Sequence, residues 1–119
     1  MKRDMELVRL ILAKMEEQPT YPSHPDLKDS GYSVEEIHYH YALLTEAGLI
    51  IAIDASGGKN LTFIPQRLTW QGHEFLEATK NNDAWSKTKE IMAKSGGFVF
   101  EVAKAVLLQI ITQQITGKL

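Results

Sequence analysis

The chain has 119 residues, of which 44% are hydrophobic and 24% are charged, and its formal net charge is −2. This length is typical of one domain with a hydrophobic core, and the composition excludes a disordered or low-complexity protein. The absence of cysteine excludes disulfide bonds, a thiolate nucleophile and any cysteine-ligated metal. The N-terminus lacks an apolar signal region, and the longest uncharged run, residues 105–117, is too short for a membrane span. We therefore expect a cytoplasmic protein without membrane association.

The first half of the chain predicts two helices. Apolar residues recur at three- and four-residue steps through residues 4–17, which is the period of an amphipathic helix. Prolines then favour an extended connector, with a short edge strand around residues 26–29. Ser33 is a good N-cap, and Glu36 completes a capping box with it. Gly48 is the expected left-handed stop, so the second helix is predicted over residues 34–47.

The second half predicts a hairpin and three more helices. Residues 49–53 and 61–64 are rich in strand-forming side chains and flank a turn-forming segment, and Pro65 places the second strand at an edge. Thr69 is expected to cap a helix that runs to about residue 80, and Asp83 is expected to cap the next one. A last helix is predicted from Phe98 to about Ile115. The predicted fold class is α+β, mainly α with a small β hairpin.

The order of these elements resembles a winged helix. The segments LLTEAGLI at residues 43–50 and RLTWQG at residues 67–72 stand before and after the hairpin, as they do in winged-helix regulators, although the usual helix before the recognition helix is compressed. The resemblance implies a winged-helix-like domain over residues 1–82. A C-terminal helical extension over residues 83–119 is expected to pack on it as one compact unit.

A narrower resemblance covers essentially the whole chain. The segments MKRDM at residues 1–5, GYS at 31–33, YHYALL at 39–44 and LTWQGHEFL at 68–76 resemble the family called domain of unknown function 2513. That family is found mainly in bacteria and in their phages or prophages, and it has no established activity. The resemblance therefore implies a fold and a biological context and leaves the function open.

The charge distribution bears on DNA binding. Residues 29–58, which include the second helix, carry five acidic residues and no lysine or arginine. A helix that reads the major groove usually carries basic residues, because phosphate contacts supply most non-specific affinity. If DNA is bound, the contacts are expected from the hairpin and from a lysine-rich surface: Lys59, Arg67, Lys80, Lys87, Lys89 and Lys94. The alternative is that these lysines lie on ordinary solvated helix faces.

His38 and His40 are the next candidates. Two residues apart on a helix, they point to different faces and are poor joint metal ligands. We expect His40 to be partly buried and hydrogen-bonded and His38 to be exposed. A pH sensor that uses both against Glu35 and Glu36 is the competing interpretation. No metal and no cofactor are predicted.

Catalytic motifs are absent from the sequence. There is no Gly-x-Ser-x-Gly elbow and no Walker-type phosphate loop, and the two glycine pairs at 57–58 and 96–97 are better explained as turns. Trp70 and Trp85 are expected to be core anchors. We therefore predict that the protein is not an enzyme.

The last helix has an unusually broad apolar stripe. It is expected either to pack across the core or to pair as well with a second copy, through Phe100, Leu107, Leu108, Ile111 and Ile115. A protein partner or a homodimer is favoured over DNA as the binding partner. The leading hypothesis is a non-catalytic winged-helix adaptor or regulator that acts through protein contacts, and the alternative is a phage-associated DNA-binding regulator.

Overall fold

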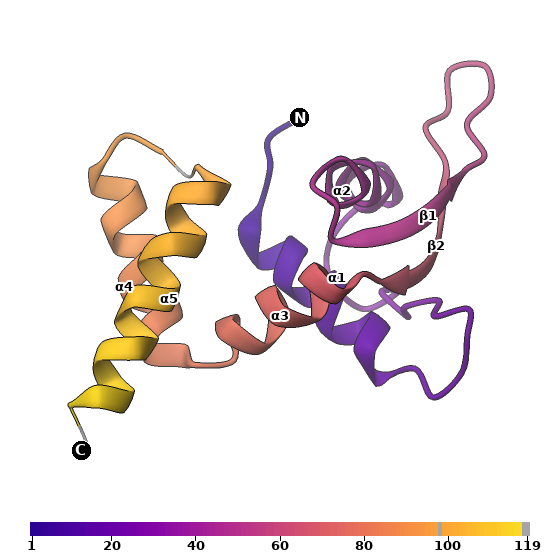
Figure 1. Ribbon diagram of the computed structural model, residues 1–119. Helices are drawn as coiled ribbons and strands as arrows, with labels where there is room; N and C mark the ends of the chain where they lie inside the picture. Colours follow the sequence, from indigo (N-terminus) through magenta and orange to yellow (C-terminus); the bar gives the residue numbers. More distant parts are fainter. Residues whose placement is uncertain (98, 118–119) are drawn as a thin grey trace. The chain divides into compact units, whose positions relative to one another are not determined.

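The computed structural model describes residues 1–97 and 99–117. Its elements, in chain order, are α1 (Met5–Glu17), α2 (Val34–Glu46), β1 (Ile50–Asp54), β2 (Phe63–Leu68), α3 (Trp70–Thr79), α4 (Asn82–Lys94) and α5 (Phe100–Thr116) (Figure 1). The two strands form one antiparallel sheet. The predicted class, mainly α with a small β hairpin, is confirmed. The predicted start of the last helix at Phe98 lies outside the described residues.

The chain divides into two compact units, Met1–Glu74 and Phe75–Leu119. The boundary between the units falls inside α3, whereas the sequence placed a boundary at residue 82. In the first unit, buried apolar side chains come from α1, α2 and the hairpin. In the second unit, α4 and α5 lie side by side (Figure 1).

The helix starts follow the local chemistry of the sequence. Asp4 is the N-cap of α1, and its carboxylate accepts hydrogen bonds from the backbone N–H groups of Glu6 and Leu7. Ser33 and Glu36 form the predicted capping box at the start of α2. Gly48 follows α2 with a φ of 74°, the left-handed conformation expected of the residue that ends the helix.

Three predicted details are wrong. Residues 27–30 form a turn where a strand was predicted at 26–29, because the Asp26 carboxylate accepts the N–H of Lys28 and the N–H of Ser30 donates to the carbonyl of Leu27. β2 runs from 63 to 68 instead of from 61 to 64. Asn81 caps α4 in place of Asp83, because its side chain accepts the N–H of Ala84.

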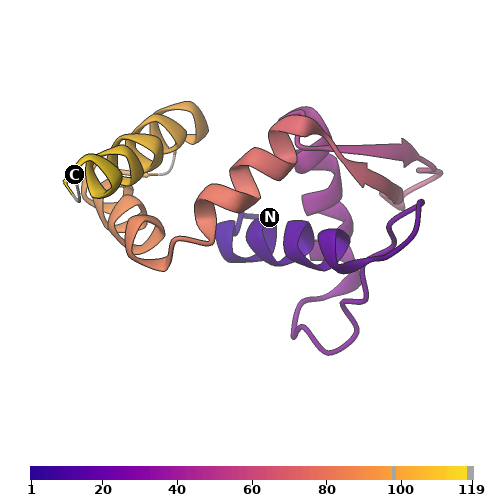
Figure 2. The same cartoon turned by 60° about the horizontal axis from the view of Figure 1, so that its bottom comes forward.

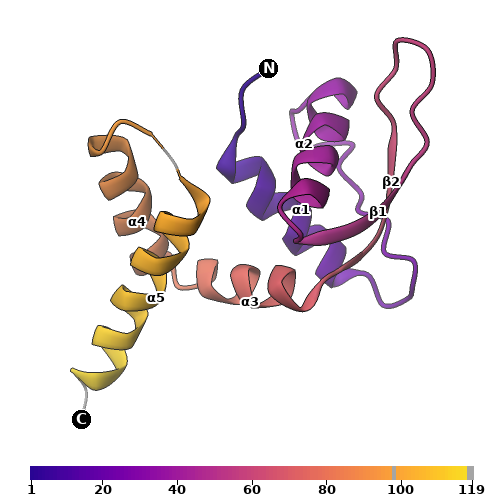
Figure 3. The ribbon, with the colours of Figure 1, turned by 45° about the horizontal axis from the view of Figure 1, so that its top comes forward.

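The hairpin contains one irregularity. Ile51 pairs with Arg67 while Ala52 pairs with Pro65, so Gln66 is an extra residue on β2. The carbonyl of Gln66 accepts the N–H of Ser23, 2.8 Å away, and this bond holds the connector after α1 against β2 (Figure 2). The loop between the strands projects beyond α1 and α2 (Figure 3).

Candidate functional site

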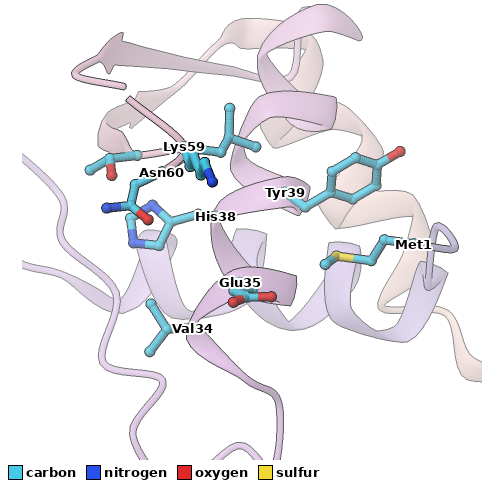
Figure 4. Close-up of a pocket in the computed structure, with 9 residues that line it drawn as sticks. Met1, Val34, Glu35, His38, Tyr39, Lys59 and Asn60 are labelled. Atoms are coloured by element: carbon cyan, nitrogen blue, oxygen red, sulfur yellow. The ribbon is translucent and has the colours of Figure 1, made fainter. Parts of the chain in front are cut away.

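A hollow of about 410 Å³ separates the N-terminal half of α2 from the end of the β1–β2 loop (Figure 4). Its volume lies within the range of small-molecule and peptide pockets. The lining side chains come from the N-terminus, α2 and the loop: Met1, Val34, Glu35, His38, Tyr39, Lys59, Asn60, Leu61 and Thr62. We call this hollow the α2–hairpin groove.

His38 fixes the spacing between the two walls of the groove. Its Nδ1 atom accepts the backbone N–H of Phe63, 3.0 Å away on β2, and its ring lies edge-on to Tyr41. Because a backbone N–H only donates, the proton of the neutral ring is on Nε2. His38 is half-buried, so the expectation that it is exposed is wrong, and its side chain lies between Asn60 and Val34 in Figure 4.

His40 has the opposite tautomer and lies away from the groove lining. It is 1% exposed, its Nε2 accepts the backbone N–H of Asp4 at 2.8 Å, and its Nδ1 donates to the carbonyl of Glu36 at 2.8 Å. The expectation of a buried, hydrogen-bonded histidine is confirmed. Both histidines are therefore backbone acceptors that join α2 to neighbouring segments.

Two opposite charges face the groove without ion-pair partners. No salt bridge joins Glu35 or Lys59 to any residue that the structure describes. Val34 and Leu61 are exposed apolar side chains on the same lining. The groove thus combines two charges that form no salt bridge with two exposed apolar side chains.

Four of the five lysines predicted to contact DNA contact side chains three or four positions before them in the chain. Lys80 pairs with Glu77 at 3.2 Å, Lys87 with Asp83 at 3.2 Å and Lys94 with Glu90 at 3.1 Å. The Lys89 ammonium lies 5.6 Å from the centre of the Trp85 ring. These contacts match the alternative of solvated helix faces.

The two hairpin residues predicted to contact DNA differ from each other. Lys59 lines the groove, whereas the Arg67 guanidinium donates to the carbonyl of Leu68 beside it. Both belong to the first unit, and the four lysines 80, 87, 89 and 94 belong to the second.

The predicted partner surface on α5 has an uneven exposure. Leu107 is 1% exposed, and the ring of Phe100 lies 5.0 Å from that of Phe75. Leu108 and Ile115 are exposed, and Ile111 is half-buried. Leu107 therefore belongs to the buried side of the helix, and the outward stripe consists of Leu108, Ile111 and Ile115.

Trp85 is buried and packs edge-on against Phe75, as expected of a core anchor. Trp70 is exposed, which contradicts the same expectation, because its indole N–H donates to Glu74 one turn further along α3 and stays at the surface. Within the described residues, no cluster of three or more histidine, aspartate or glutamate side chains is placed to hold a metal ion. None of the described helices is long and apolar enough to cross a membrane.

Sequence reasoning missed most of the groove. It singled out His38 and Lys59, but Val34, Tyr39 and Leu61 were not identified as site residues. The available signal was weak. Val34 is a β-branched residue in the first turn of an acidic helix, and Leu61 lies in the loop between the strands, so both positions suggest exposed apolar side chains.

The comparisons with known proteins agree with one another. The model of the family described as "Hypothetical protein (DUF2513)" matches residues 2–98. The chain belongs to this family. An uncharacterised protein of Haemophilus influenzae is 39% identical over 118 residues, which cover 97% of this chain and 99% of that protein. No solved structure matches the DUF2513 chain.

Proposed function

We propose that this DUF2513 protein is a non-catalytic adaptor or regulator of bacterial or phage origin that acts through protein contacts. The α2–hairpin groove is the proposed contact site. The observation that carries this proposal is the pair of unpartnered charges, Glu35 and Lys59, beside the exposed apolar side chains of Val34 and Leu61. Protein interfaces combine apolar contact with a few hydrogen bonds and charge pairs in this way.

The distribution of charge supports a protein partner over DNA. The unit Met1–Glu74 contains seven basic and eleven acidic residues, a net charge of −4. Duplex DNA carries one negative charge per roughly 1.7 Å of helix axis, so a partner with this charge is repelled at long range. Three of the four candidate lysines in the other unit already pair with carboxylates.

The alternative function is a DNA-binding transcriptional regulator that uses its hairpin as a wing. It is favoured by the order of the elements and by the position of Lys59, which has no carboxylate partner among the described residues. In this alternative, Lys59 and Arg67 contact the phosphate backbone, and a second basic surface consists of Lys80, which follows α3, and of Lys87, Lys89 and Lys94 on α4.

Photo-crosslinking tests the protein-contact proposal. A photoreactive amino acid at Val34, on the groove, is expected to give one discrete protein adduct in cells of the source bacterium. The same amino acid at Tyr21, which is also exposed but does not line the groove, is the matched control. Lys59→Glu is expected to abolish the Val34 adduct without unfolding the chain, since Lys59 lies in the exposed loop.

A DNA titration separates the two functions. Fluorescence anisotropy of a random duplex at several salt concentrations is expected to show no binding that depends on salt. The logarithm of the affinity falls with the logarithm of the salt concentration by about 0.9 per phosphate contact. A slope of several contacts would overturn the protein-contact proposal if Lys59→Glu and Arg67→Glu both reduced the affinity.

In the crosslinking experiment, identical adducts at Val34 and Tyr21 would remove the groove as the contact site.

A further inference from the structure

β1 pairs with β2 along one edge, and no second strand among the described residues pairs with its other edge. The N–H of Ala55 donates to the carbonyl of Thr62 at 2.9 Å, and the N–H of Thr69 donates to the carbonyl of Leu49 at 3.0 Å, so residues 49 and 55 direct their backbone groups towards the neighbouring strand. Because backbone direction alternates along an antiparallel strand, 51 and 53 also face β2. Residues 50, 52 and 54 therefore direct their N–H and C=O groups outward.

The far edge of β2 differs, because other segments already use it. Phe63 donates its N–H to His38, Pro65 has no N–H, and the carbonyl of Gln66 accepts from Ser23. At the outer edge of β1, no hydrogen bond from any described residue reaches the backbone groups of Ala52 or Asp54. Ile50 is buried, Ala52 is half-buried and Asp54 is exposed, so the part of this edge that a partner can reach begins at Ala52.

The free edge adjoins an exposed apolar face of the sheet. Ile51 is 45% exposed, Ile53 is 53% exposed, and Ile64, paired with Ile53 across the hairpin, is also exposed. Natural proteins usually protect a free edge with lysine, proline or a bulge. β1 contains no lysine, proline or bulge; the bulge of the hairpin lies on β2, and Asp54 is the one charged residue of β1.

The charge at this edge is negative. The Asp54 carboxylate accepts hydrogen bonds from the hydroxyl and backbone N–H of Ser56, which lower the pKa of Asp54 and keep it ionised. Asp54 has no salt bridge to any described residue. Its side chain and those of Ile51 and Ile53 lie on opposite faces of the strand, because successive side chains alternate.

We propose that β1 accepts an extended segment of a protein partner as an additional strand, and that this segment alternates apolar and basic residues. The outward backbone groups of Ala52 and Asp54 supply main-chain hydrogen bonds, as in other cases of strand addition. The apolar residues cover Ile51 and Ile53, and a basic residue lies opposite Asp54. This surface is separate from the α2–hairpin groove and does not depend on it.

A second copy of the chain is a poorer occupant of the same edge. An antiparallel self-pairing centred on Ile53 uses the accessible groups of Ala52 and Asp54, but it places the two Asp54 side chains diagonally across from each other. A pairing centred on Asp54 places them directly opposite. Like charges at such positions are destabilising, so charge favours a basic partner strand.

A peptide titration tests this proposal with defined probes. The probe is an end-blocked, fluorescently labelled peptide of alternating lysine and valine, and the control probe alternates glutamate and valine. The full-length protein is expected to bind the lysine peptide and not the glutamate peptide. Ala52→Pro removes one outward N–H without touching the bonds to β2, and we expect it to weaken binding by about tenfold, which corresponds to the loss of one hydrogen bond. Ala52→Ser, which keeps the N–H, is expected to bind like the wild type.

A second variant does not depend on proline being tolerated. Asp54→Lys, at an exposed site, is expected to reverse the preference from the lysine peptide to the glutamate peptide. Equal binding of both peptides, equal binding by Ala52→Pro and Ala52→Ser, or a wild-type dimer that Ala52→Pro dissociates would overturn the proposal. The Val34 crosslink reports on the groove separately, so a failure at the edge is distinguishable from a failure of the proposed function.

Discussion

His40 is a buried polar residue whose two ring nitrogens are both used. It joins the middle of α2 to the first turn of α1 through the backbone N–H of Asp4. Asp4 in turn accepts a hydrogen bond from the Tyr32 hydroxyl at 3.0 Å. This network aligns the N-terminal ends of α1 and α2, and a buried polar group of this kind is costly when it loses its partner.

We expect His40→Leu to lower the free energy of unfolding by about 1–3 kcal/mol, because the N–H of Asp4 loses its acceptor and the carbonyl of Glu36 loses its side-chain donor. Urea denaturation followed by circular dichroism measures this change. His24→Leu is the control, because His24 is exposed. Equal stability of the two variants would contradict the role assigned to His40.

Tyr41 makes the stability of the fold depend on pH in the alkaline range. Burial raises the pKa of its phenol from the ordinary value of 10.0 to about 12. The unfolded chain therefore loses this proton at a lower pH than the folded chain does. The contribution of Tyr41 to the free energy of unfolding is complete below pH 10 and is lost as the pH rises towards 12. Thermal unfolding across this pH range is expected to show a smaller decline for Tyr41→Phe than for the wild type. Tyr21→Phe, at an exposed site, is expected to follow the wild-type curve.

At the scale of elements, α3 begins in close contact with the turn before β1. Thr69 donates its hydroxyl to the carbonyl of Gly48 at 2.6 Å, and its oxygen accepts the N–H of Gly72 at 3.0 Å, so one side chain both caps α3 and ties it to the end of α2. A Cβ atom on Gly72 would lie inside van der Waals contact with the carbonyl oxygen of Leu49. The glycine is therefore required by the close approach of two backbones.

Gly72→Ala is expected to destabilise the protein by about 2 kcal/mol or more, because the steric conflict with rigid backbone exceeds the helix propensity of about 1 kcal/mol that alanine gains. Gly57→Ala, where the added Cβ meets nothing, is the control. Chemical denaturation of both variants tests the prediction. A Gly72→Ala protein as stable as the wild type would show that the two segments separate easily.

Local signals in the sequence predicted the ends of the helices well where one residue determines where the helix begins or stops. The Ser33–Glu36 capping box, the stop at Gly48 and the cap at Thr69 were all predicted, because each depends on hydrogen bonds between neighbours in the chain. The errors occurred where hydrogen bonds to distant segments, or competing local ones, determine the bounds of an element. β2 continues to residue 68 because Gln66 is accommodated as an extra residue, and no local pattern predicts that.

At the scale of the whole molecule, the two units differ in charge. The first unit is acidic, with a net charge of −4, and the second contains six basic and four acidic residues, a net charge of +2. The sequence showed this asymmetry, but it did not show that the lysines pair within their helices. The groove was largely unpredicted, because its walls are brought together by the bond between His38 and Phe63, twenty-five positions apart in the sequence.

The homodimer that the sequence favours stays a prediction, and its test follows from the exposure of the residues on the outward stripe of α5. Leu108→Glu combined with Ile115→Glu is expected to give a monomer that unfolds at the wild-type temperature, since both side chains are exposed. Leu107→Glu is expected to lower that temperature, because it buries a charge. Light scattering after size-exclusion chromatography measures the mass. A double variant that remains a dimer would exclude this stripe as the interface.

The opposite tautomers of His38 and His40 make each ring a separate magnetic resonance reporter. In His38 the protonated nitrogen is Nε2, and in His40 it is Nδ1. The chemical shifts of Nδ1 and Nε2 are therefore in opposite order in these two residues of α2. The His38 signals report on the hydrogen bond between α2 and the hairpin, and the His40 signals report on the hydrogen bond between α2 and the start of α1. A bound partner that opens the groove would therefore change the nitrogen shifts of His38 and leave those of His40 in place.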